Sequence, residues 1–523
     1  MRILFLSIII IVSNNSISQI GQSIINYNNC SAVVTDAGLL FNNPIFSSAG
    51  YEFPKGATTH IIYSSSFMFG ATDTNGDTLL STTTYLGDTE LFEGPHSNNG
   101  SYPAATSIWS VAKSDVDYHN ANYTQSGYIA ATRILAWPGN GNVSFGQNTN
   151  LAPFIDLNGN NIYEPLLGDY PDIRGDYATY IIMNDAEKTH ANAGTPPLQI
   201  EVHLMLYQYI SNDYLDSTTF INMRVYNYSS NNYINFITSM FLDADIGNLY
   251  DDYAGCDSTK NLVFGYNGDA FDESNGGFTG YGITPAALGV LSLSHNLSSF
   301  LSYSGTGPYP YNIPNSKSGF WNAMHGKWND GASLFKGGNG IVGSTGVTTT
   351  PTNFHYHGNP NSPAEWSEVS AVNPPGDRRA IFSVEEVNLP AGGSQCYDFA
   401  IIANMQSDNL TNVQHIYTMA DQVQTFFNSQ TFNCNQVTVS VDEKKLSNFQ
   451  VYPNPIDGVI NIQNRLTSNE TKVIIADLSG RIIYENKFAP KPLLTLNFNQ
   501  KPGTYLITIT SGNLSETKTV VVK

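Results

Sequence analysis

Long runs of alternating apolar and polar residues recur along this chain, whereas helical periodicity is almost absent. Alternation with a period of two is typical of strands, because successive side chains point to opposite faces of a sheet. The residues that fill these runs are rich in Val, Ile, Tyr, Phe and Thr, which favour a pleated backbone. The clearest runs are 60–69, 199–209, 220–228 and 233–242. They predict an all-β body, most plausibly a large β-sandwich with long loops.

Two segments carry a helical spacing instead. Residues 104–120 do so loosely, and residues 409–427 place a stripe of apolar side chains on one face. We therefore expect a few short helices. From 266 to 373 the chain is rich in Gly, Pro, Asn and Ser and has few regular runs. Loops of that length in an ordered domain are usually functional or stabilised by ions.

The first residues predict a secretory signal peptide over residues 1–18. Met1 and Arg2 give a short positive end, Ile3 to Val12 an apolar stretch, and Ser16 to Ser18 a small-residue cleavage site. No other stretch approaches eighteen consecutive apolar residues, so we expect no transmembrane segment in the mature chain.

Four cysteines follow the predicted signal peptide: Cys30, Cys256, Cys396 and Cys434. In an exported chain, cysteines without a Cys-x-x-Cys spacing favour disulfides over metal binding. Three pairings are open, and Cys396 with Cys434 closes the shortest loop.

Charge is distributed unevenly along the chain. Residues 19–445 contain 14 Lys and Arg against 38 Asp and Glu, a net charge of −24, whereas residues 446–523 contain 8 against 5, a net charge of +3. An acidic body disfavours nucleic acid as a partner, because phosphate binding needs the opposite sign. It suits divalent cations.

The last 75 or so residues read as a small β-sandwich of the immunoglobulin-like kind, because short β-rich runs alternate with turn residues. They begin Val451-Tyr-Pro-Asn-Pro, continue through Asp477-Leu-Ser-Gly-Arg and Gly503-Thr-Tyr-Leu, and end in a basic, Val-rich terminus. In this order the motifs resemble the type A C-terminal sorting domain of the Bacteroidetes type IX secretion system. The resemblance implies export to the outer cell surface or the extracellular space, with the secretion translocon and a surface sortase as partners.

These features predict the domain organisation. A signal peptide spans 1–18, an all-β cargo body 19–436, a linker 437–446 and the sorting domain 447–523, and a sub-boundary near 195 is a further option. The cargo body also resembles a recurrent exported family without an assigned activity, through segments such as 150–165, 167–176, 250–257 and 321–328. That second resemblance implies location and no mechanism.

The sharpest candidate for a metal site is the loop that begins at Asp156. It offers oxygen ligands at Asp156, Asn158, Asn160, the carbonyl of Ile162, Glu164 and Asp169. Oxygens converging from one tight loop are what calcium needs, and the pattern resembles the first half of an EF-hand or dockerin loop. Leu167 stands where the bidentate acid is due, so Glu164, Asp169 or Asp172 would have to close the site. The alternative is an Asn/Gly turn held by side-chain-to-backbone hydrogen bonds.

A second acidic group contains Asp243, Asp245, Asp251 and Asp252. On a strand, residues 243 and 245 point to the same side and hold two carboxylates together. Three interpretations stay open: a structural cation such as calcium, a solvated acidic loop, or the paired acid and base of a glycoside hydrolase.

Aromatic residues in the long irregular region, among them Trp321, Trp328 and Trp366, either pack under the loops or stack on sugars. His355 and His357 are either neutral loop histidines or half of a zinc site. We therefore carry two functional hypotheses. The first is a non-catalytic surface or adhesion protein with structural calcium; the second is a carbohydrate-active enzyme or glycan binder that uses Asp243 and Asp245.

Overall fold

The computed structural model describes residues 20–85, 89–97, 107–186, 190–305, 307–432, 449–464, 470–477, 481–512 and 514–523. The predicted signal peptide and the predicted linker lie outside these residues. The chain divides into two compact units, Met1–Val437 and Thr438–Lys523, and residue 195 lies inside the first.

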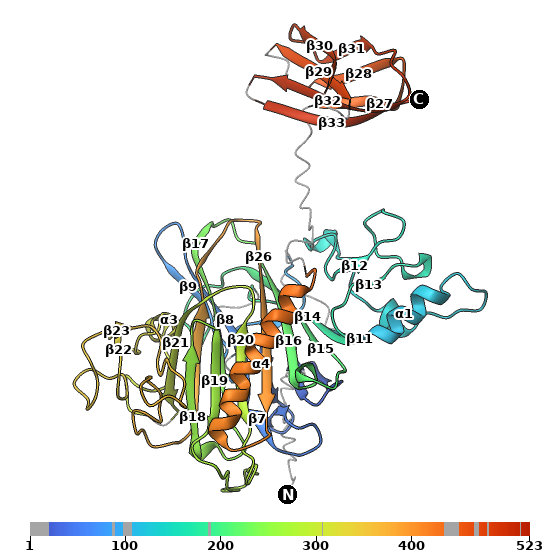
Figure 1. The fold of residues 1–523 in the computed structure, drawn as a ribbon. Helices are drawn as coiled ribbons and strands as arrows, with labels where there is room; N and C mark the ends of the chain where they lie inside the picture. Colours follow the sequence, from blue (N-terminus) through green and yellow to red (C-terminus); the bar gives the residue numbers. More distant parts are fainter. Residues whose placement is uncertain are drawn as a thin grey trace, which may run out of the picture. The chain divides into compact units, whose positions relative to one another are not determined.

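The first unit contains two large antiparallel sheets (Figure 1). Among the described residues one sheet has eleven strands and places β17 (Tyr233–Asp243) near its centre. In spatial order it comprises β21 (Leu297–Ser304), β24 (Arg378–Val384), β17, β8 (Ser64–Thr72), β3 (Leu39–Leu40), β2 (Ser31–Thr35), β6 (Tyr51–Glu52) and β7 (His60–Ile62), with β1 (Gln22–Ile25) beside β2, β25 (Val387–Leu389) beside β17 and β9 (Thr78–Ser81) beside β8.

The other sheet has nine strands in the part of the chain that is described. Its spatial order is β10 (Phe92–Glu93), β14 (Tyr177–Asn184), β15 (Ile200–Gln208), β16 (Thr218–Asn227), β26 (Ser394–Asn404), β20 (Ala287–Ser292), β19 (Leu262–Asn267) and β18 (Asp252–Asp257), with β11 (Ile108–Ala112) beside β14. Small two-stranded pairs join β12 (Phe154–Ile155) to β13 (Tyr170–Pro171), β22 (Leu334–Phe335) to β23 (Pro351–Thr352), and β4 (Asn42–Asn43) to β5 (Ser48–Ala49).

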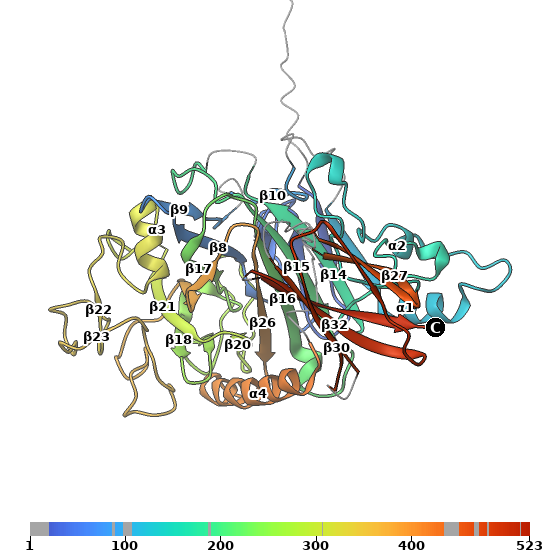
Figure 2. The same cartoon turned by 90° about the horizontal axis from the view of Figure 1, so that it is seen from above.

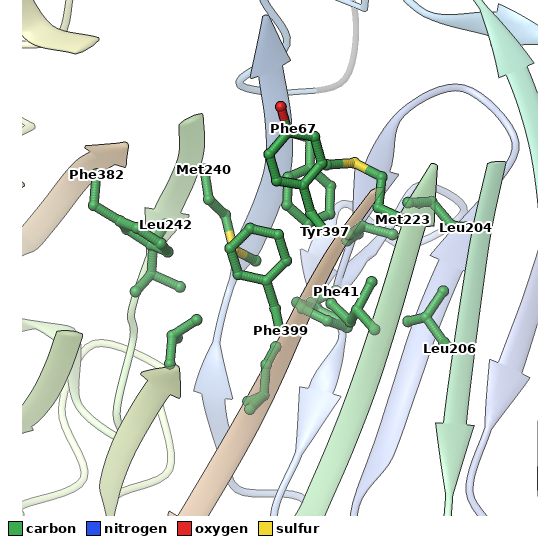
Figure 3. Packing of buried hydrophobic residues seen from close by; sticks show 14 of the residues in the cluster. Phe41, Phe67, Leu204, Leu206, Met223, Met240, Leu242, Phe382, Tyr397 and Phe399 are labelled. Carbon is green, nitrogen blue, oxygen red and sulfur yellow. The ribbon is translucent and has the colours of Figure 1, made fainter. Parts of the chain in front are cut away.

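The facing surfaces of the two sheets bury the main apolar core, in which residues of both sheets interdigitate (Figure 3). Phe67 of β8 and Phe399 of β26 meet there, with ring centroids 5.2 Å apart. Because both strands are covered on both faces, they are buried along nearly their whole length, which explains their continuous apolar runs. The predicted all-β body is confirmed.

Helices and long loops cover the outer faces of the sheets. α4 (Asn409–Ser429) packs on β19, β20 and β26 (Figure 2), and the side chain of Asp408 caps it by accepting the backbone N–H of Thr411. α3 (Lys317–Met324) and the long irregular region cover the outer face of the other sheet. The remaining helices are α1 (Lys113–Asn122), α2 (Thr132–Leu135) and the 3-10 turns Val143–Phe145, Pro165–Leu167, Tyr214–Ser217 and Leu249–Asp251.

Sequence periodicity predicted the helix over 409–427 correctly, and it was only partly right over 104–120. Residues 108–112 form a strand, because their backbone pairs with β14 in the register Ile108↔Ile181 to Ala112↔Tyr177. The helix begins only at Lys113. A weak apolar stripe does not outweigh a full set of ladder hydrogen bonds.

The second unit is a seven-stranded β-structure in its described residues, with its own apolar core around Phe449, Ile475 and Ile507. β27 pairs with β33 in parallel at Ile456↔Val522, and the other pairs are antiparallel. Its strands, in spatial order, are β30 (Ile482–Phe488), β29 (Thr471–Asp477), β32 (Gly503–Ser511), β33 (Leu514–Val522), β27 (Phe449–Asp457), β28 (Val459–Asn464) and β31 (Leu493–Asn497).

The cysteines depart from expectation. Cys30 and Cys256 are buried free thiols, so disulfide formation is wrong for these two. Both belong to the core between the sheets, where burial raises the pKa of Cys30 to about 12 and keeps its thiol unreactive. Cys434 lies outside the described residues, and the pairing of Cys396 with Cys434 stays a prediction.

The inter-sheet core predicts the effect of a truncation. Phe399→Ala should lower the free energy of unfolding by about 3–5 kcal/mol, because it removes a buried ring and leaves a cavity between the sheets. Urea unfolding followed by tryptophan fluorescence measures this, since all five tryptophans precede residue 433. Ile234→Ala, on β17 with the side chain 71% exposed, should change stability by less than about 0.5 kcal/mol. Equal losses in the two variants would contradict the packing described.

Candidate functional site

Two buried carboxylates, those of Asp243 and Asp245, lie where strand β17 ends. Asp243 is the last residue of the strand and pairs with Ser64 of β8 on one side and with Arg379 of β24 on the other. Because the strand is flanked on both sides, Asp243 is 1% exposed, and Asp245 just beyond it is 7% exposed. The sequence predicted that these two side chains lie together, and they do, although the strand ends at Asp243 and does not include Asp245.

Asp377 completes a group of three acids. It lies directly before β24, and antiparallel pairing brings the start of β24 to the end of β17. One carboxylate oxygen from each of Asp243, Asp245 and Asp377 lies within 4.8 Å of the other two. Over the described ranges, this is the one group of three or more His, Cys, Asp or Glu side chains gathered closely enough to hold a metal ion.

Arg379 supplies the positive charge of the group. Its Nη1 lies 3.0 Å from Asp377 Oδ2, and its Nε lies 3.3 Å from Asp243 Oδ1. The Nε hydrogen is donated to the hydroxyl of Tyr85, which in turn donates to Asp243 Oδ2 at 2.7 Å. The contact with Asp243 Oδ1 is therefore an ion pair without hydrogen-bond geometry.

The three carboxylates are not fully compensated. Against the single guanidinium of Arg379 they carry a net charge of −2 when all are ionised. Asp243 Oδ1 and Asp377 Oδ1 are buried and have no hydrogen-bond partner among the described residues. Buried charge without compensation is costly, and carboxylate oxygens are the ligands that hard cations prefer. The arrangement therefore suits a divalent cation.

The pKa values of the group reflect the same imbalance. Burial raises the pKa of Asp243 to about 6, although Arg379 and Tyr85 favour its charged form. Burial, followed by repulsion from Asp243 and Asp377, raises the pKa of Asp245 well above its ordinary value. The pKa of Asp377 is also raised by burial, with Arg379 opposing. Without a cation, protons are the remaining counter-charge.

Two pockets approach this group. Asp243, Asp245, Arg379 and Tyr85 line one of about 510 Å³, together with Asn42, Ser47, Tyr63, Leu249 and Phe278. Asp377 lines another of about 720 Å³ that extends under the long loops. The three acids therefore line two neighbouring pockets, and within the described residues no tryptophan lines the first.

Asp251 and Asp252, predicted as further ligands, do not join the three acids. Asp252 is buried at the start of β18, where its Oδ2 accepts the backbone N–H of Ile246 at 3.0 Å. Asp251 lies in a 3-10 turn, and burial, with repulsion from Asp272, raises its pKa to about 7. They form a neighbouring acidic region.

The loop from Asp156 to Asp169 directs its oxygens to its own backbone. Asp156 accepts the N–H groups of Gly159 and Asn161, which lower its pKa. The side chains of Asn158 and Asn160 accept the N–H groups two residues on, and both donate to Glu164. Buried Asp169 accepts from Leu157 and Glu164. This is the turn arrangement weighed as the alternative, and calcium at this loop stays a prediction.

His355 and His357 have other partners. Both ring nitrogens of His355 face backbone carbonyls, of Ser302 and Asn339, and burial lowers its pKa to about 3. His357 Nε2 lies 2.8 Å from the hydroxyl of Ser258. Trp328 and Trp366 are buried under the loops, and Trp321 of α3 is half-buried.

Sequence reasoning missed Asp377, Arg379 and Tyr85. Asp377 and Arg379 stand at the start of an expected strand, but which strand pairs with which cannot be read from one sequence. Tyr85 follows a buried Thr82–Thr84 stretch with no pattern of its own. The acidic residue Asp377, three residues before the apolar run 380–384, was the one usable signal.

Residues 450–523 match the family described as secretion system C-terminal sorting domain. This part of the chain is a type IX secretion C-terminal sorting domain, and the resemblance seen in the sequence is confirmed. The protein is thus a type IX secretion cargo, exported to the extracellular space or the outer cell surface. Its sorting domain implies interaction with the secretion machinery.

No curated protein matches the sequence. Among solved structures 33 chains match, one of them a polysaccharide lyase with 6% identity and a TM-score of 0.18, covering 62% of this chain and 34% of that one. A likeness this low carries no argument about fold or activity. Within the described residues, no helix has both the length and the apolar character to cross a bilayer.

The raised pKa of Asp251 predicts a pH dependence of stability. An acid with a folded pKa of about 7 and an unfolded pKa near 3.8 binds more protons in the folded state, so it lowers the free energy of unfolding as pH rises between these values. Asp251→Asn should therefore gain stability relative to the wild type from about pH 4 to pH 7.

Urea unfolding in chelator at several pH values measures that difference. Using the difference cancels the buried histidines such as His355, whose lowered pKa acts in the opposite sense. Asp421→Asn, which replaces an exposed carboxylate of α4 that pairs with Lys260, is the control for the loss of a surface acid. A difference for Asp251→Asn that does not change with pH would contradict the raised pKa of Asp251.

Proposed function

We propose that the body is a non-catalytic, adhesion-type surface cargo that is stabilised by a divalent cation, with calcium as the first choice. Asp243, Asp245 and Asp377 would hold the ion. The observation that carries the proposal is the buried group of three carboxylates, with its net charge of −2 and its two oxygens without hydrogen-bond partners. The ion would supply the positive charge that the residues lack.

Calcium is favoured by the ligand chemistry. The group offers oxygen only, and calcium takes about six to eight oxygen ligands in flexible geometry. The adjoining pocket of about 510 Å³ leaves room for water or ligand oxygens to complete the shell. Zinc and copper prefer nitrogen or sulfur, which the group does not provide. The loop from Asp156 to Asp169 remains a second calcium position on sequence grounds.

A structural role is favoured by the way Asp243 is held. Arg379 and Tyr85 fix its carboxylate, and the side chain is buried at the end of a central strand. A nucleophile or base needs access to substrate, whereas a structural ligand needs only fixed geometry.

The second candidate is a glycoside hydrolase that uses Asp243 and Asp245. Two observations favour it: carboxylate oxygens of the pair lie within 4.8 Å, near the roughly 5–5.5 Å separation of retaining enzymes, and the raised pKa of Asp245 would suit a general acid. The same raised pKa follows from a cation site without its ion, so it does not separate the two candidates.

Calcium should raise the melting temperature of the full-length protein relative to chelator at pH 7. At a free calcium concentration one hundred times its Kd, the expected stabilisation is about 2.7 kcal/mol. The shift should shrink at pH 5, because protons compete for the same carboxylates. A melting temperature that is the same with calcium and with chelator would contradict the proposal.

Variants locate the ion. Asp245→Asn and Asp377→Asn should each abolish the calcium-dependent shift. In chelator, Asp245→Asn should be as stable as the wild type or more so, because it removes a buried charge that has no ion-pair partner among the described residues. Asp377→Asn also breaks the ion pair with Arg379 and should show a smaller gain or none. Asp156→Asn should keep the shift. If Asp156→Asn alone abolished it, the ion would belong to the loop from Asp156 to Asp169 and not to the three-acid group.

A panel of polysaccharides tests the second candidate. The proposal expects no release of reducing ends from any member by the calcium-loaded protein. Turnover on one polysaccharide, lost in Asp245→Asn and retained in Asp421→Asn, would replace the adhesion proposal with the hydrolase.

A further inference from the structure

The pocket of about 720 Å³ next to the three acids has an aromatic lining. It lies between the end of β21 and the long loops, and Tyr250, Tyr303, Tyr311, Trp328 and Tyr356 contribute to its walls. The ring of Trp328 is fixed edge-on against Tyr311 and His355, at centroid distances of 4.8 and 5.6 Å. Three prolines, Pro308, Pro374 and Pro375, stiffen the rim. The pocket is therefore largely pre-formed.

Two side chains that line this pocket carry a buried polar group with no hydrogen-bond partner among the described residues: Trp328, through Nε1, and Tyr303, through its hydroxyl. Trp366, buried close by under the same loops, differs, because its Nε1 donates to the carbonyl of Gly338 at 2.9 Å. Buried polar groups are nearly always paired, so two unpaired ones in the wall of one pocket indicate a ligand or bound water.

We propose that this pocket binds a neutral saccharide. Aromatic rings accept the C–H faces of a sugar, and Tyr250, which is 54% exposed, offers such a ring at the mouth. Sugar hydroxyls can both donate and accept hydrogen bonds, which matches an indole N–H and a phenol hydroxyl in one lining. A lipid chain would leave both polar groups unpaired.

The charges around the pocket exclude an acidic ligand. Arg378 lines the wall, but its guanidinium is bound to Glu368 through three hydrogen bonds of 2.8 to 3.1 Å. Asp377, the other charged lining residue, is paired with Arg379. No uncommitted cation therefore faces the pocket within the described residues, and a body with a net charge of −24 repels polyanions.

The inference deepens the proposed function, on which it rests, since it names the ligand class of a surface-binding protein. It also places that ligand next to the proposed ion. Asp377 belongs to the three-acid group and lines the saccharide pocket as well. A cation that fixes Asp377 would also fix this wall of the pocket.

Isothermal titration of the full-length, calcium-loaded protein tests the inference. The probes are cello-, xylo-, manno- and laminari-oligosaccharides of two to six units, with oligogalacturonate as the acidic comparison. We expect binding of at least one neutral series and none of oligogalacturonate. Tyr303→Phe should weaken that binding by about twofold to tenfold, because it deletes one hydrogen-bonding group and keeps the ring. Trp328→Phe should weaken it by at least as much, because it deletes the indole N–H and also removes part of the aromatic surface.

Trp366→Phe is the matched control. Both tryptophans are buried, so Trp366→Phe and Trp328→Phe should each lower stability through the lost ring volume, and Trp366→Phe loses an internal hydrogen bond as well. Only Trp328→Phe should weaken saccharide binding, and Trp366→Phe should leave the affinity unchanged. The inference would be overturned if no neutral series bound, or if Trp328→Phe and Tyr303→Phe bound with the same affinity as the wild type. The calcium-dependent melting shift, measured on the same samples, reports on the ion separately and would survive that outcome.

Discussion

The register between β17 and β24 governs the arrangement of this body. β17 is a central strand of the eleven-stranded sheet, and its pairing with β24 sets Asp243 opposite Arg379. A shift of one residue would turn Met240 and Leu242 from the inter-sheet core to the outer face, so the apolar layer fixes the register. The position of Asp377 beside Asp243 and Asp245 follows from that apolar packing.

Two neighbouring arginines on β24 differ in how fully the protein compensates the charge of their acidic partners. Arg378 and Glu368 form a closed pair, in which one guanidinium meets one carboxylate through several hydrogen bonds. Arg379, the next residue, faces two carboxylates and has a third close by. The first pair is complete within the protein, whereas the second needs a proton or a cation from solution. The long loops next to this second site also enclose the aromatic pocket. The proposed ion site and the proposed saccharide pocket are therefore neighbours.

The periodic parts of the sequence predicted the fold well. The strands around 200–208, 218–227 and 233–243 and the helix from 409 were visible, because each buries a regular face. Residues 108–112 were misread because pairing with a distant strand decided their conformation. In the site, Asp243 and Asp245 could be predicted, since they are two residues apart where one strand ends. Asp377 could not, because its approach depends on strand order, which local patterns do not encode.

The three acids stand at the ends of two strands that are far apart in the sequence, and this separation decides when an ion could bind. The three carboxylates come together only after β24 has paired with β17. An ion bound there would therefore link two distant segments of the chain at a late stage of folding. An exported protein meets its final ionic surroundings after it leaves the cell. Such an ion would let the body stay less stable during export and become more stable once it is outside the cell.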